Sequence, residues 1–271
     1  MTDFVAASQL TAAERAELFN AAYEDYVVPF QLDEERLLFM ERAYGNDLDA
    51  SLIAVAEDGA RVGLANLARE ERDGWVAGVG VVKPHRGRGV GEELMRRLHA
   101  AARELGLERV WLEVIVENLA ALRLYEKLGY EHVRDLEVWT LGELVAQSNY
   151  PLPARATVAE ANAWIRAHRA EREPWQRSDA TLARLEELEP APEALAVYGG
   201  AAIVRRTEGR VSLLQIAATS DNVYKELFER VAAPGGSLSL LNLPAGDPAG
   251  AVLAGLGGRV DIRQHELALE L

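Results

Sequence analysis

Hydrophobic positions along the first third of the chain change from helical spacing to strand alternation. Apolar residues recur every three to four positions over 11–27 and again over 33–45. Three runs then alternate between apolar and polar residues, at 51–57, 61–70 and 75–82. Asp-Gly pairs separate these three runs, and such pairs are typical of hairpin turns. The pattern predicts two helices followed by an antiparallel meander.

The spacing then alternates between helix and strand. A helical pattern over 91–106 is followed by a strand pattern over 109–117, a helical pattern over 118–129 and a strand pattern over 130–141. A strand, helix, strand succession requires a crossover connection, which joins parallel strands. We therefore expect an α/β fold with a mixed, partly antiparallel sheet.

A weak internal repeat extends this pattern to the rest of the chain. When the chain is aligned with itself at an offset of 128 residues, Leu128-Gly129 aligns with Leu256-Gly257. The predicted strand and helix before each pair align as well, and each helix ends at the glycine. Few residues are identical, but the periodicity persists. The chain is predicted to hold two tandem copies of one fold, the second diverged from the first.

A stretch with two prolines and little apolar pattern, Gln147 to Arg155, separates the two copies. The sequence therefore predicts one domain over 1–148, a linker over 149–155 and a second domain over 156–271. It leaves the oligomeric state open.

The composition of the chain limits which partners and which cellular location we expect. The formal net charge of −14 repels phosphate backbones, so we expect no nucleic acid partner. The acidity serves solubility or attracts a cationic substrate, and both interpretations stay open. There is no cysteine, no secretory pattern at the start and no apolar run long enough to span a bilayer. A cytoplasmic protein without a membrane role is expected.

The stretch "HRGRGVGEEL", from His85 to Leu94, joins a predicted strand to a predicted helix. Gly87, Gly89 and Gly91 remove side chains that would block an anion, and the start of the helix offers unpaired amides and its positive dipole end. Arg86 and Arg88 add charge. The pattern predicts a diphosphate cradle.

Other interpretations of this stretch are a nucleotide P-loop, a dinucleotide-binding turn and an ordinary glycine-rich connection. A P-loop needs Lys followed by Ser or Thr at the helix start, where this chain has "GVGEEL". A dinucleotide-binding turn follows an early parallel strand, whereas this one follows a meander. The ordinary connection stays open as the alternative.

Residues 79–140 resemble the core of the Gcn5-related N-acetyltransferase (GNAT) family. "VGVVKPHRGRGVGEELMRRL" is similar to its acyl-CoA motif and "LEVIVENLAALRLYEKLGYEHV" to its next strand and helix, with a looser likeness over 1–148. The resemblance implies a splayed sheet that admits acetyl-CoA, with its pyrophosphate on the cradle. The pantetheine would lie along the predicted strand that ends at Val82 and would contact Asn118 at the start of the helix over 118–129. The binding residues so implied are Val81, Val82, Arg86, Gly87, Arg88, Gly89, Val90, Gly91 and Asn118.

Glu113 and Tyr125 are the candidate catalytic residues. Glu113 lies between Trp111 and Ile115 on one strand face, and apolar surroundings make a carboxylate more ready to accept a proton. Its alternatives are a rim carboxylate or one paired with an arginine. Tyr125 by itself suggests core packing, but the resemblance implies a phenol beside the CoA sulfur and a glutamate base. Glu113 is therefore expected to act as the base and Tyr125 as the acid. Asn118 combines this implied contact with a possible helix cap.

The repeat places Leu241 and Leu253 where the first copy has Glu113 and Tyr125, and the second copy lacks the arginine-glycine cradle. We therefore expect one acetyl-CoA site, in the first copy. His85 and His99 have no partner at ligand spacing, so no metal is expected. The favoured function is acetyl-CoA-dependent transfer of an acetyl group to a primary amine on a small molecule or peptide. The alternative is a CoA-binding sensor or scaffolding protein that has lost catalysis.

Overall fold

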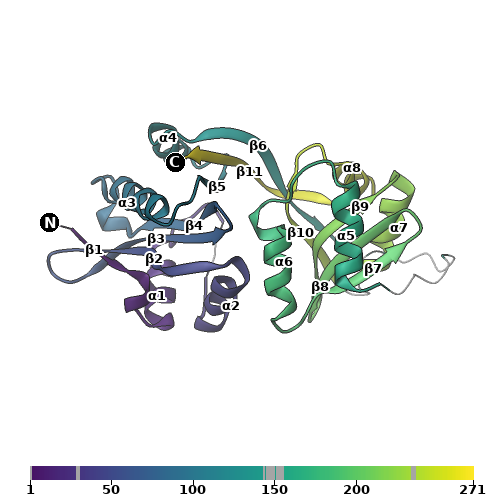
Figure 1. The fold of residues 1–271 in the computed structure, drawn as a ribbon, viewed down its shortest axis with the longest axis horizontal. Coiled ribbons are helices and arrows are strands. Elements are labelled where there is room, and N and C mark those ends of the chain that lie inside the picture. Colours follow the sequence, from purple (N-terminus) through teal and green to yellow (C-terminus); the bar gives the residue numbers. More distant parts are fainter. Residues whose placement is uncertain (1, 29–30, 143, 145–149, 151–155, 233–235) are drawn as a thin grey trace. The chain divides into compact units, whose positions relative to one another are not determined.

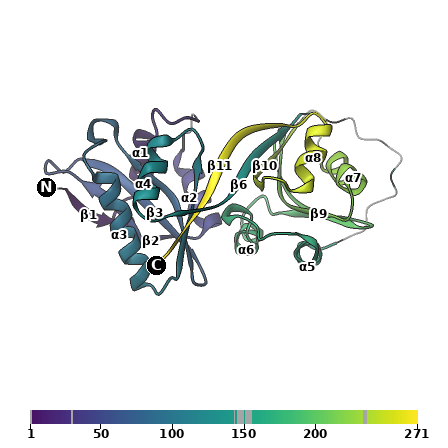
Figure 2. The same cartoon turned by 90° about the horizontal axis from the view of Figure 1, so that it is seen from above.

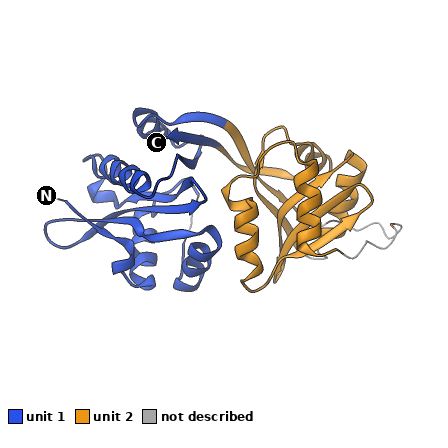
Figure 3. Ribbon diagram, viewed as in Figure 1, with its two compact units in different colours: residues 1–133, 265–271 blue, residues 134–264 orange. Residues whose placement is uncertain are grey.

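The computed structural model describes residues 2–28, 31–142, 144, 150, 156–232 and 236–271. The chain divides into two compact units (Figure 3). Unit 1 comprises residues 1–133 and 265–271, and unit 2 comprises residues 134–264. No helix of the described residues is long and apolar enough to cross a membrane.

Unit 1 is built on a mixed sheet with helices on both faces. Its strand order is β1-β2-β3-β4-β5-β11, where β11 (Arg259–Glu270) comes from the end of the chain. The pairing is antiparallel from β1 to β4 and parallel between β4 and β5. One apolar core lies between the sheet and α3 and α4, and another between the sheet and α1 and α2 (Figure 1). The elements from the first half of the chain are β1 (Asp3–Ala6), α1 (Ala12–Ala22), α2 (Glu34–Tyr44), β2 (Asn46–Val55), β3 (Arg61–Glu70), β4 (Asp73–Val81), α3 (Val90–Glu104), β5 (Arg109–Ile115), α4 (Leu119–Lys127) and β6 (Glu131–Leu141).

Local sequence signals set several of these boundaries. Thr11 and Glu14 form a capping box at the start of α1, and Gly45 ends α2 in the left-handed conformation. The helix expected over 11–27 stops at Ala22, because the chain turns there toward the sheet. The short strand β1 has no clear alternation, so the sequence pattern missed it.

The parallel ladder between β4 and β5 is short. It begins at Asp73 beside Arg109 and ends at Trp75 beside Trp111. In β4 the register against β3 then shifts, which leaves Ala77 as an extra residue before Gly78. The sheet therefore opens between β4 and β5, as the family resemblance implied.

Unit 2 repeats this order of elements. Two helices precede three antiparallel strands, a helix, a parallel strand, a helix and a final strand. These elements are α5 (Val158–His168), α6 (Asp179–Glu186), β7 (Glu193–Val197), β8 (Gly200–Thr207), β9 (Arg210–Ala218), α7 (Asp221–Val231), β10 (Ser237–Pro244), α8 (Pro248–Gly255) and β11 (Arg259–Glu270). β5 and β10 begin 128 residues apart, which is the predicted offset. The expected tandem copies are confirmed.

The boundaries of the two compact units differ from those of the two tandem copies. Most of β6 belongs to unit 2, where it pairs with β10, and the end of β11 belongs to unit 1, where the amide of Leu271 donates to the carbonyl of Glu108 at 2.9 Å. The C-terminus accordingly lies in unit 1 (Figures 2 and 3). The expected domain ranges 1–148 and 156–271 stay a prediction, and the compact units differ from them because each copy gives its last strand to the other copy's unit. Apart from Tyr150, the expected linker 149–155 lies outside the described residues.

A buried ion pair joins α1 to α2. Arg15 donates to both carboxylate oxygens of Glu41, each at 2.8 Å, and to the carbonyl of Leu10 at 2.6 Å. Because the pair is buried, Arg15→Met should leave an uncompensated charge and lower the free energy of unfolding by about 3 kcal/mol in urea denaturation. The control is Arg61→Met, which breaks a half-exposed pair with Glu14 and should cost less than about 1 kcal/mol. Equal losses in the two variants would contradict this ranking.

A buried histidine makes the stability of unit 1 depend on pH. His99 of α3 contacts the Tyr130 hydroxyl through Nε2 at 2.9 Å, and burial, followed by Arg103 and Arg96, lowers its pKa from 6.5 to about 4. Between these values the unfolded chain binds a proton that the folded chain does not, so the free energy of unfolding should fall as the pH drops from 6.5 toward 4. Urea denaturation across this range should show a shallower fall for His99→Gln than for the wild type, and parallel curves would refute the assignment.

Candidate functional site

Unit 1 contains a cavity of about 600 Å³ where β4 and β5 separate. It is lined by the end of α1 and the turn after it, β4, the glycine-rich turn, β5 and α4. Among the predicted site residues, those that line the cavity are Val81, Arg86, Gly87, Gly89, Val90, Gly91, Glu113, Asn118 and Tyr125. The tertiary structure therefore brings together residues from two motifs that are separated in the sequence.

The glycine-rich turn leaves its backbone accessible. Gly87 and Gly89 have φ angles of 73° and 83°, and a Cβ atom at either position would meet nothing within 4 Å. Only glycine adopts such angles without strain, and α3 begins directly after Gly89. The unpaired amides of the first turn of α3 and its positive dipole end thus lie at the cavity.

Acidic groups near this turn are paired with cations. Glu92, in the first turn of α3, contacts Lys127 Nζ at 2.6 Å and Arg96 Nη2 at 2.9 Å. Lys127, followed by Arg96, lowers the pKa of Glu92. On the other wall Asp25 pairs with Lys83 at 2.8 Å, which lowers the pKa of Asp25. These pairs weaken the repulsion that a bound anion would meet.

The predicted binding residues do not all face the cavity in the same way. Arg86 donates through Nε to the carbonyl of Val81 at 2.8 Å and through Nη2 to that of Ala22 at 2.9 Å, so its guanidinium links β4 to the end of α1. The amide of Val82 donates to Val62 of β3, which turns this residue away from the opening, and the expected pairing at Val82 does not fit. Arg88 is exposed and does not line the cavity within the described chain.

Tyr23 holds the wall of the cavity against β4. Its hydroxyl donates to the carbonyl of Val79 at 3.1 Å, and its ring stacks on Phe19 with centroids 4.3 Å apart. A Cβ at Gly78 would approach the Tyr23 hydroxyl to 3.2 Å, and one at Gly80 would approach Cε2 of the ring to 3.1 Å. These two glycines therefore permit the close approach of α1 to the bulged strand.

Glu113 of β5 lies at the cavity with a tryptophan partner. The indole Nε1 of Trp75 donates to Oε2 of Glu113 at 2.7 Å. Trp75 is buried, and the Tyr44 ring packs against it edge to face with centroids 5.7 Å apart. No local pattern in the sequence signals Trp75, because its contact with Glu113 depends on the pairing of β4 with β5.

Tyr125 of α4 is buried beneath the cavity and packs edge to face on Tyr130, with centroids 5.6 Å apart. Burial, followed by the nearby Tyr26, raises the pKa of Tyr125. Burial likewise raises the pKa of Tyr26, which a hydrogen bond with Asn118 partly opposes. Both phenols are therefore neutral near pH 7. Asn118 also caps α4, accepting from the Ala121 amide at 3.2 Å, as predicted.

The equivalent place in unit 2 is filled by the chain itself. β9 has the same bulge, with Leu214 as the extra residue and Gln215 where β4 has Gly78. Arg177 donates through Nε to the carbonyl of Leu214 at 2.7 Å, and the buried side chain of Gln215 donates to the carbonyl of Arg177 at 2.7 Å. The backbone that remains open in unit 1 is therefore closed in unit 2 by the segment between its first two helices.

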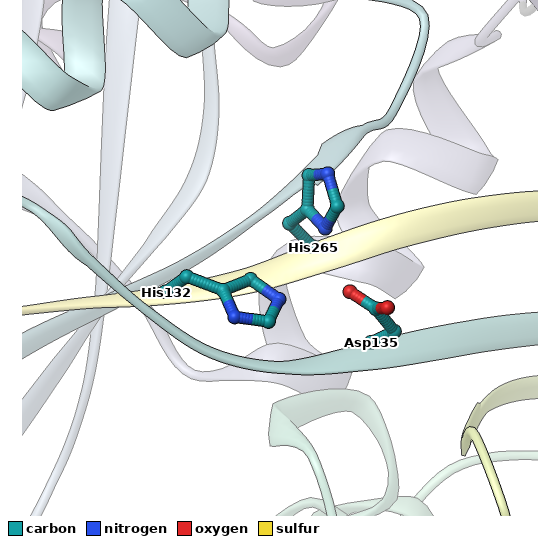
Figure 4. A group of neighbouring side chains, drawn as sticks. All are labelled: His132, Asp135 and His265. Atoms are coloured by element: carbon teal, nitrogen blue, oxygen red, sulfur yellow. The ribbon is translucent and has the colours of Figure 1, made fainter.

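Two histidines form a separate ring pair in unit 1. His132 of β6 and His265 of β11 lie edge to face with centroids 5.0 Å apart (Figure 4). Asp135, also drawn in Figure 4, belongs to unit 2. Because the group is divided between the units, we assign no metal to it, and the expected absence of a metal stays a prediction.

Comparison with known proteins supports this description of fold and family. Residues 15–130 match the model of the Acetyltransferase (GNAT) family. The N-alpha-acetyltransferase MAK3 of Arabidopsis thaliana is 43% identical over 68 residues, which cover 25% of this chain and 36% of that protein. The chain thus spans about a third of the length of this relative.

Two solved structures extend the likeness to the whole chain. A GCN5-related N-acetyltransferase from Sphaerobacter thermophilus aligns with a TM-score of 0.73 and 17% identity, over 99% of this chain and 95% of the other. A tandem GNAT protein from the clavulanic acid biosynthesis pathway aligns with a TM-score of 0.65 and 14% identity, over 100% and 98% of the two chains. At these identities the likeness concerns the fold. Residues 15–130, within the first copy, match the acetyltransferase (GNAT) family, and the chain as a whole has the tandem form of that fold.

Proposed function

We propose that this protein transfers an acetyl group from acetyl-CoA to a primary amine, at a single site in unit 1. The observation that carries the proposal is the cavity between β4 and β5, which joins an open glycine turn at the start of α3 to Glu113 and Tyr125. This combination suits a substrate with an anionic part and a reacting end.

Backbone groups would bind the anionic part. The amides from Gly87 to Gly91 and the dipole of α3, a helix of 15 residues, favour a diphosphate at the turn. Arg86 supports this turn indirectly, since its hydrogen bonds to Val81 and Ala22 hold β4 to the end of α1. Val81 and Asn118 line the path between the turn and the reacting end.

At the reacting end, Glu113 would accept the proton that an ammonium must lose before its nitrogen attacks. When bound, acetyl-CoA supplies an acetyl group activated as a thioester. Glu113 takes this first proton directly or through water, and the neutral nitrogen then forms the new C–N bond as the C–S bond breaks. The departing thiolate gains a proton through its hydrogen bond with Tyr125, whose hydroxyl recovers one from the nitrogen's second proton through water, so the products are an amide and a free thiol. The Ala77 bulge, two residues after Trp75 on β4, interrupts the pairing with β3 and bends the strand near this end of the cavity.

Tyr125 would stabilise the departing sulfur by hydrogen bonding. Burial keeps its hydroxyl protonated near neutral pH. A thiolate leaving into the same buried surroundings is also desolvated, which raises its proton affinity and strengthens a hydrogen bond from the phenol. The acetyl acceptor is proposed only as a primary amine of a small molecule or peptide, which the acidic protein attracts when it is charged.

The cradle assignment predicts a loss of donor binding when the turn is blocked. Acetyl-CoA at 100 times its dissociation constant should stabilise the wild type by about 2.7 kcal/mol. Gly89→Val places a branched side chain at the open turn and should abolish the corresponding thermal shift. The matched control is Gly106→Val, where glycine also has positive φ and open surroundings but lies at the other end of α3. A Gly89→Val protein that keeps the wild-type shift would refute the cradle.

The catalytic assignment predicts slow variants that still bind. In a thiol-release assay with a panel of primary amines, Glu113→Gln and Tyr125→Phe should each lower kcat by about 10²- to 10⁴-fold. Both should keep the acetyl-CoA thermal shift of the wild type. If the wild type binds acetyl-CoA but releases no thiol with any amine, the protein is a sensor or scaffold and the enzymatic proposal fails.

A further inference from the structure

The Trp75–Glu113 hydrogen bond lies beside the proposed reacting end, and Glu113 but not Trp75 lines the cavity within the described residues. Trp75 is 6% exposed and is the last residue of β4 that pairs with β5. The donor is thus fixed by the sheet at the point where the two strands part.

We propose that Trp75 is a positioning residue for Glu113, an inference that rests on the proposed function. Its indole orients the carboxylate across the opening and stabilises the ionised form that must accept a proton. With Oε2 accepting the indole N–H, Oε1 is the atom that takes the proton of the ammonium.

Three features of the structure support this role of Trp75. The ladder places its backbone directly beside Trp111, two residues before Glu113 on β5. The Tyr44 ring at the end of α2 packs on the indole. The 2.7 Å distance is that of a strong hydrogen bond to a charged acceptor.

The second copy gives an independent internal comparison. Its matching bulge and parallel ladder pair Ser212 with Ser239, at the positions of Trp75 and Trp111. Two residues after Ser239, Leu241 stands in the place of Glu113. Donor and carboxylate are therefore lost together in the copy that lacks the site, while the backbone that carried them is retained.

The first test is spectroscopic and needs no substrate. In ¹⁵N-labelled protein, Trp75→Phe identifies the Trp75 indole resonance among those of the five tryptophans. We expect this resonance downfield in the wild type and shifted upfield in Glu113→Gln, because the carboxylate acceptor is gone. An unchanged Trp75 resonance in Glu113→Gln overturns the inference, whatever the enzyme's activity.

The second test is kinetic. Incorporating 3-benzothienylalanine at position 75 replaces the indole N–H by sulfur and keeps the ring shape, so it avoids the void that Trp75→Phe leaves in this buried position. We expect kcat to fall about tenfold to a hundredfold, with KM for acetyl-CoA unchanged, because the lost bond acts on the base alone. The control is the same replacement at Trp139, whose indole also donates to a glutamate, Glu137 at 3.0 Å, but lies in unit 2; its kcat should stay within about twofold of the wild type.

These outcomes separate the inference from the proposed function. If Glu113→Gln is slow and the benzothienyl protein has the wild-type kcat, only the role of Trp75 is wrong. If Glu113→Gln itself has the wild-type kcat, the assignment of the base fails and the inference fails with it.

Discussion

The site depends on the end of the parallel ladder at Trp75 and Trp111. Up to this pair, β4 and β5 satisfy each other's backbone groups, and beyond it they part. The bulge at Ala77 changes the direction of β4 at the same point, and Gly78 and Gly80 let Tyr23 pack closely along the strand. Without this opening, the glycine turn and Glu113 would lie on an ordinary sheet with no cavity between them.

The tandem copies show that the short ladder and the bulge are not sufficient for an open cavity. Unit 2 retains the short parallel ladder and the bulge, but Arg177 and Gln215 satisfy the opened strand from within. Its loss of the site thus follows from side chains that fill the space. The exchange of β6 and β11 provides a physical reason to keep this second copy, since unit 1 takes the end of β11 as the strand beside β5.

Near the cavity of unit 1, acidic side chains are neutralised by lysines although the whole protein carries a net negative charge. The chain is strongly acidic, yet Glu92 and Asp25 beside the cavity each pair with a lysine. The anion binding proposed for this turn relies mainly on peptide dipoles, because Arg86 already donates to the carbonyls of Val81 and Ala22. An acidic protein can therefore combine an anion-binding turn with a surface that attracts cationic amines.

The sequence by itself determined the tandem copies, most elements of each, the glycine turn and the candidates Glu113 and Tyr125, because periodicity, glycine conformation and short motifs are local properties. It did not determine that β6 and β11 exchange units, that Arg86 binds carbonyls, that Val82 faces β3 or that Trp75 holds Glu113. Each of these is a contact between segments far apart in the chain. Strand pairing and register decide such contacts, and only the tertiary structure fixes both.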